Sequence, residues 1–99
     1  MNKLNRKKIG VTVLVTSYSQ REITIATANY YSEICNDVIL IDEQQPYLSE
    51  SDINYLGDKG VRYIPYEANE KTKNPILEKR LIGATKAKNN YLAHSNHDE

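Results

Sequence analysis

Short runs of β-branched and aliphatic residues alternate in this chain with longer segments whose apolar residues recur at helical spacing. This alternation constrains the fold more than any other feature, because strands separated by helices form parallel sheets. The short apolar runs are typical of buried strands. The predicted strands are Ile9–Val15, Val38–Ile41, Val61–Ile64 and Tyr91–Ser95.

Three segments between these strands carry helix signals. Each follows a residue type that caps helix N-termini, and Pro75 after the third cap suits a first helical turn. The predicted caps are Ser19, Ser49 and Asn74. Glycines at positions 57 and 60 are expected to end the second helix. The apolar positions at helical spacing are Ile23, Ala26, Tyr30 and Ile34 within Arg21–Ile34, and Leu77, Leu81 and Ala84 in the third helix.

The resulting order, β-α-β-α-β-α-β, predicts an α/β fold. Right-handed crossovers would place helices on both faces of a mainly parallel, four-stranded sheet, which gives a three-layer α/β/α arrangement. With 99 residues, the chain has room for one core, so residues 1–99 are expected to form a single domain.

Composition excludes several classes of protein. The 13 basic residues balance the 13 acidic ones, which argues against nonspecific binding to nucleic acid. No apolar run approaches the roughly 18 residues of a membrane span, and no signal peptide is evident. Cys35 is the only cysteine, which predicts a buried structural thiol in a cytoplasmic protein. The eight tyrosines, in a chain without Phe or Trp, fit either ordinary core aromatics or a stacking surface.

In an open α/β sheet, ligands bind beyond the carboxyl ends of the strands, so the residues that follow each strand are the candidates for a site. The four glycines form neither a G-x-G-x-x-G fingerprint nor a P-loop. His94, Ser95 and Asp98 are too close in sequence to converge as a catalytic triad. With these motifs excluded, the residues that follow the predicted strands are mostly polar and rich in hydroxyl groups.

Three of these strand ends offer groups suited to a nucleotide and a metal. Asp42 ends the second strand, where a carboxylate can accept hydrogen bonds from a ribose or a base, and Thr16 ends the first. Residues Asn96–Glu99 follow the fourth strand and could hold Mg²⁺ or Mn²⁺, which would neutralise a diphosphate. The alternatives are that Asp42 caps the following turn and that Asn96–Glu99 is a solvated chain end.

Four segments together resemble family 2 glycosyltransferases with the GT-A fold. The run from Val11 to Ser19 is similar to the opening strand of that family, and Val38–Asp42 is similar to its second strand, which ends in an acidic residue. Arg80–Gly83 is similar to its Arg-Asn-x-Gly stretch, with Leu81 in place of Asn. Asn90–Asp98 resembles the approach to its Asp-x-Asp metal motif, with Asn96 in place of the first Asp.

The resemblance implies a role for six residues. It assigns a nucleotide-diphosphate sugar, expected to be a UDP-sugar, to a Rossmann-like half of the GT-A fold, with Mn²⁺ or Mg²⁺ as cofactor. The implied nucleotide-binding residues are Thr16, Tyr18, Asp42, Arg80 and Asn96, and the implied metal ligand is Asp98.

The resemblance also implies what this chain lacks. Members of the family carry the acceptor-binding half and the catalytic base after the metal motif, so we expect residues 1–99 to be the donor-binding half, inactive alone and without a catalytic residue. The alternative is a non-catalytic α/β module that binds a nucleotide or a protein. A receiver-like signalling domain is disfavoured, because Thr16–Gln20 contains no carboxylate. Exposed sheet edges would favour a homo-oligomer.

Overall fold

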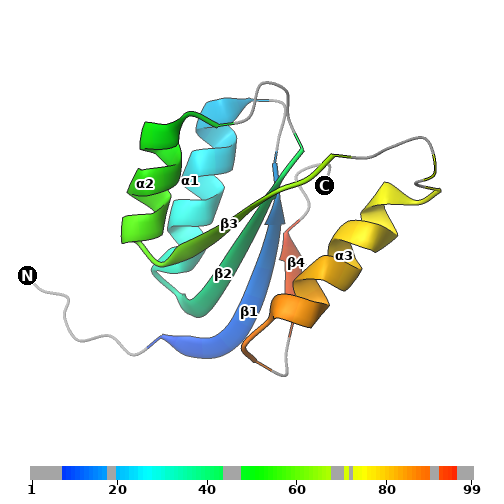
Figure 1. The fold of residues 1–99 in the computed structure, drawn as a ribbon. Helices are drawn as coiled ribbons and strands as arrows, with labels where there is room; N and C mark the ends of the chain where they lie inside the picture. Colours follow the sequence, from blue (N-terminus) through cyan, green and yellow to red (C-terminus); the bar gives the residue numbers. More distant parts are fainter. Residues whose placement is uncertain are drawn as a thin grey trace, which may run out of the picture.

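A computed structural model describes residues 8–17, 20–43, 48–67, 71, 73–89 and 92–95. Strands and helices alternate along the chain, as Figure 1 shows. The elements are β1 (Ile9–Thr16), α1 (Arg21–Ser32), β2 (Cys35–Asp42), α2 (Glu50–Asp58), β3 (Val61–Pro65), α3 (Pro75–Lys86) and β4 (Leu92–Ser95).

The strands lie in the order β3-β2-β1-β4, and all three neighbouring pairs are parallel. The predicted α/β class with parallel strands is therefore confirmed. The chain moves outward from β1 to β2 to β3 and then crosses back, so that β4 pairs with the opposite side of β1. The strand order thus reverses between β1 and β4.

Alternate residues of the central strands point to opposite faces of the sheet and form two separate apolar clusters. On one face, Val13, Val15 and Leu40 cluster with Ala28 of α1 and Leu56 of α2. On the other face the cluster contains Leu14, Ile39 and Ile41, with Ile82 of α3 packed against it. In Figure 1, α1 and α2 accordingly lie together on one side of the sheet, and α3 lies on the other. Cys35 is buried in the first cluster, as predicted.

The first helix begins where predicted, but its N-cap differs. Gln20 is the cap residue and makes no side-chain capping bond, whereas Ser19 lies outside the described residues. The helix ends at Ser32 rather than Ile34, because the chain turns through Glu33 and Ile34 into β2.

The predicted apolar stripe of α1 does not form its buried face. Ile23, Ala26 and Tyr30 are exposed, and the fully buried positions are Thr24, Ala28 and Ser32. These three small side chains, spaced four residues apart, let the helix approach the sheet closely. Hydrophobicity alone therefore selected the wrong face.

The second helix starts as predicted, because the Ser49 hydroxyl accepts a hydrogen bond from the Asp52 backbone N–H at 3.2 Å. Its end differs in detail: Gly57 lies inside the last turn, and the chain leaves the helix through Gly60, whose φ of 92° favours glycine.

The third helix is capped as predicted, with the Asn74 side chain accepting from the Leu77 N–H at 3.1 Å. The predicted apolar stripe of this helix is not the side that packs on the sheet, since Leu77, Leu81 and Ala84 are exposed. The residue buried against the sheet is Gly83, which lies directly over Leu14. Because a glycine adds nothing to a hydrophobic pattern, the spacing of the leucines does not reveal which side of α3 packs against the sheet.

Candidate functional site

The carboxyl ends of the parallel strands meet at one edge of the sheet, which we call the carboxyl edge. Thr16, Asp42 and Pro65 end β1, β2 and β3, and Ser95 ends β4 opposite Val15. Since the strand order reverses between β1 and β4, this edge contains the topological switch point at which α/β folds bind ligands.

The loops after β1 and β2 are tied to each other at this edge. Ser17 is buried, its N–H donates to the Ile41 carbonyl at 3.0 Å, and its hydroxyl accepts from the Glu43 N–H at 2.9 Å. Thr16, the predicted nucleotide contact, is half-buried and pairs with Ile41. The neighbouring Tyr18 lies outside the described residues.

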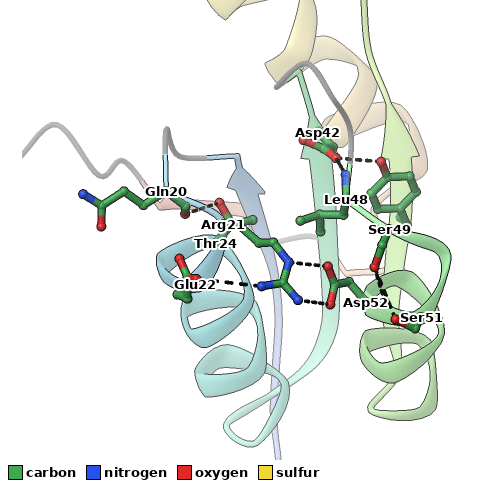
Figure 2. A network of polar contacts seen from close by, with 10 residues as sticks. Gln20, Arg21, Glu22, Thr24, Asp42, Leu48, Ser49, Ser51 and Asp52 are labelled. Atoms are coloured by element: carbon green, nitrogen blue, oxygen red, sulfur yellow. Dashed lines mark hydrogen bonds and ion pairs between the residues drawn. The ribbon is translucent and has the colours of Figure 1, made fainter.

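Asp42 is held by hydrogen bonds from Leu48, which follows it in the chain, and from Tyr63 of β3. Its side chain is 1% exposed, and Oδ2 accepts hydrogen bonds from the Leu48 N–H at 2.9 Å and the Tyr63 hydroxyl at 2.7 Å. Figure 2 shows the first of these bonds, between Leu48 and Asp42. This geometry is the turn-capping role that the sequence left open as an alternative. Two donors therefore already order the Asp42 carboxylate.

A second set of polar contacts joins this edge to α3. The Lys79 ammonium lies 2.5 Å from the Glu43 carboxylate and 5.8 Å from the centre of the Tyr66 ring. The Tyr66 hydroxyl donates to the Glu78 carboxylate, and the Tyr66 N–H donates to the Asp42 carbonyl at 2.8 Å. Glu43 and Tyr66 fall in the strand-end segments that the sequence singles out, whereas Glu78 and Lys79 carried no signal because they lie within a helix.

The structure does not bring Arg80 into this group of contacts. Its side chain is exposed on α3, and within the described part of the chain it makes no ion pair. Arg80 thus remains a predicted nucleotide contact that faces solvent.

The predicted metal ligand, Asp98, and the predicted nucleotide contact Asn96 lie outside the described residues. Among residues 8–17, 20–43, 48–67, 71, 73–89 and 92–95, no three His, Cys, Asp or Glu side chains gather as a metal site would require. Two of the described carboxylates near this edge, Asp42 and Glu43, already have partners.

The starts of α1 and α2 are joined by an ion pair that the sequence analysis missed. Arg21 donates from Nε to one Asp52 oxygen at 2.6 Å and from Nη2 to the other at 2.7 Å, as Figure 2 shows. The hydrogen bond from Arg21, followed by that from Ser49, outweighs burial and holds the pKa of Asp52 below its usual value. The same pair raises the pKa of Arg21. Thirty residues separate the partners in sequence, so no local pattern could reveal them.

A buried polar network lies at the opposite edge of the sheet. Asp37 accepts from the Thr12 hydroxyl at 2.8 Å, from two nitrogens of Arg62 at 2.9 and 3.1 Å, and from the Lys88 N–H at 2.9 Å. Burial acts to raise the pKa of Asp37, but the bonds from Lys88, Thr12 and Arg62 together lower it. Arg62 also donates to the Lys86 carbonyl, so the network fixes the segment that leads from α3 into β4.

Comparisons with known proteins identify no relative of this chain: no family model, no curated protein and no solved structure matches it. Among the described residues, no helix is long and apolar enough to cross a membrane.

Proposed function

We propose that this chain is the donor-binding half of a GT-A glycosyltransferase and binds a nucleotide-diphosphate sugar, with UDP as the expected nucleotide. The observation that carries the proposal is the strand order β3-β2-β1-β4, whose reversal lies between β1 and β4. The residues that follow these two strands in the chain include Tyr18, Asn96 and Asp98, three of the six that the family resemblance assigns.

The chemistry expected at this edge is binding rather than bond cleavage. Thr16 would offer its hydroxyl and backbone groups to the nucleotide, and Asp42 would accept from the uracil or ribose with a carboxylate whose Oδ2 atom Leu48 and Tyr63 hold in place. Arg80 would approach the base or the diphosphate. Asp98, with Asn96 beside it, would hold Mg²⁺ or Mn²⁺, which would stabilise the leaving nucleotide when bound.

The finer architecture belongs to the same proposal. We take the sheet with helices on its two faces as the Rossmann-like, three-layer half of a GT-A fold. The acceptor site and the catalytic base would come from a further part of the enzyme, so residues 1–99 alone would bind the donor without transferring the sugar. A cytoplasmic location fits the single buried thiol, Cys35.

Calorimetric titration of UDP into the whole chain, with and without Mg²⁺, tests this function. We expect binding that strengthens when the metal is present and loses that dependence in Asp98→Ala. Asp58→Ala, which removes an exposed carboxylate at the end of α2, is the matched control and should bind as the wild-type chain does. Metal-independent binding, or none at millimolar UDP, would contradict the proposal.

A non-catalytic protein-binding module is the second candidate, and one observation favours it. The outward side of α3 exposes Leu77 and Leu81, which are unusual residues for a solvated helix face. Failure of UDP to bind, together with failure of this face of α3 to bind lipid, would leave this module as the better account.

A further inference from the structure

The outer side of α3 combines exposed leucines with a concentration of positive charge. Ile76, Leu77 and Leu81 are 59, 52 and 58% exposed, although each is large and apolar. Leu77, Leu81 and Ala84 follow one another at helical spacing, so they form one stripe along the helix. The other side of the helix is already used, since Gly83 lies against Leu14 and Ile82 packs against the cluster around it.

The charge of this segment differs sharply from that of the rest of the chain. Residues 71–89 contain six basic residues and one acidic residue, Glu78, which gives a formal charge of +5 in a chain whose net charge is zero. The remaining residues therefore carry −5. The six basic residues are Lys71, Lys73, Lys79, Arg80, Lys86 and Lys88.

Three of these lysines stand at the two ends of the leucine stripe. Lys73 precedes the N-cap of α3, Lys86 is the last residue of the helix, and Lys88 follows two residues later; all three are exposed. Glu78 is bonded to Tyr66, and Lys79 pairs with Glu43, so these two charges are used within the fold. The charge that the segment presents outward is therefore positive.

We propose that this face of α3 docks on the surface of an anionic lipid bilayer. An apolar stripe with lysines around it fits such a surface, because the leucines enter the acyl boundary while the long lysine side chains reach the headgroups. A second copy of this chain fits less well, because a symmetric contact would bring two faces of charge +5 together. The helix spans about 18 Å for its 12 residues and lies flat on the surface without crossing it.

Co-sedimentation of the full chain with vesicles tests the proposal. We expect binding to vesicles of phosphatidylserine and phosphatidylcholine that weakens as salt is added, and much weaker binding to phosphatidylcholine alone. Each of Leu77→Ser and Leu81→Ser should lower the partition coefficient by about tenfold or more, as expected for an inserted leucine. Each of Lys73→Gln, Lys86→Gln and Lys88→Gln should lower it by about fivefold, as expected for one lysine near an anionic surface.

Matched controls come from the other side of the molecule. Ile23 of α1 is 44% exposed, and Lys59 follows α2. Ile23→Ser therefore removes an exposed apolar side chain, and Lys59→Gln removes a positive charge, on a side of the molecule where no membrane contact is proposed. Both should bind as the wild-type chain does. All of the substituted side chains are exposed, and far-ultraviolet circular dichroism would verify that each variant folds.

The proposal is overturned if the wild-type chain fails to bind the anionic vesicles, or if the leucine variants bind as well as the controls do. The proposal would also be overturned if the wild-type chain did not bind vesicles but bound an acidic polypeptide through Leu77 and Leu81. That result would assign this face of α3 to a protein partner. Because the vesicles contain no nucleotide, each of these results is independent of UDP binding.

Discussion

Arg21 and Asp52 join the first turn of α1 to the first turn of α2 through two parallel hydrogen bonds of 2.6 and 2.7 Å. A basic residue at a helix N-terminus is unfavourable to the helix dipole, and the Asp52 carboxylate offsets it. The pair also fixes the relative position of the two helix starts beside the carboxyl edge.

We predict that Arg21 and Asp52 are energetically coupled. In a double-mutant cycle with Arg21→Ala and Asp52→Ala, measured by urea denaturation, the coupling should be favourable because Asp52 is largely buried and both its oxygens are engaged. The matched control is Arg21 with Glu22, which lie 3.8 Å apart and are both exposed. That pair should show almost no coupling. Equal coupling in the two cycles would contradict the structural role of Asp52.

We predict opposite effects of alanine at two helical glycines. A Cβ atom at Gly83 would lie 2.8 Å from both terminal carbons of Leu14, so Gly83→Ala should destabilise the chain by about 1 to 3 kcal/mol. At Gly57 a Cβ would meet nothing within 4 Å, and Gly57→Ala should stabilise it by up to about 1 kcal/mol. Thermal denaturation of both variants checks the pair. A stable Gly83→Ala variant would mean that α3 does not pack closely over Leu14.

We predict that Asp37 is the polar residue on which stability depends most. Asp37→Ala would leave Thr12, Arg62 and the Lys88 N–H without their acceptor, and Arg62 is partly buried. The expected loss is about 2 to 4 kcal/mol in the free energy of unfolding, measured in urea. Asp58→Ala, at an exposed position, should change it by less than about 0.5 kcal/mol. Similar losses in both variants would contradict this account.

We predict that acid destabilises the fold through Asp37 and Asp52. Both carboxyl groups have a pKa below the unfolded value of about 3.9, so their contribution is fully present above that pH. This contribution to the free energy of unfolding is lost as the pH falls toward and through the lower pKa values of the folded chain. The reason is that the unfolded chain, whose carboxyl groups have the higher pKa, binds protons first. Urea denaturation between about pH 6 and pH 3, the range in which carboxylates titrate, measures this slope. The slope should become shallower in Asp37→Asn and stay unchanged in Asp58→Asn; an unchanged slope in Asp37→Asn would exclude the assignment.

How far the sequence predicts the structure depends on which signal a residue carries. Strand positions were found because buried parallel strands are continuous apolar runs, and the caps Ser49 and Asn74 were found because capping is local. The buried faces of α1 and α3 were not predicted, because they are formed by the small residues Thr24, Ala28 and Gly83. Small residues let a helix pack close to the sheet, but they add little to a hydrophobic pattern.

The candidate site was predictable only at the level of the strand ends. Thr16 and Asp42 lie at the carboxyl edge because their strands end there. The partners of Asp42, Leu48 and Tyr63, depend on the loop path and on the neighbouring strand, and no local pattern specifies either.

Mapping the amide shifts caused by UDP and Mg²⁺ tests the central claim most directly, because it reports where on the sheet the nucleotide binds. The account predicts the largest shifts at Thr16, Asp42 and Ser95, at the ends of β1, β2 and β4, and little change around Asp37 and Lys88 at the opposite edge. Replacing Mg²⁺ with Mn²⁺ should broaden the same signals near the metal. Shifts centred on the opposite edge, or none at saturating nucleotide, would contradict it.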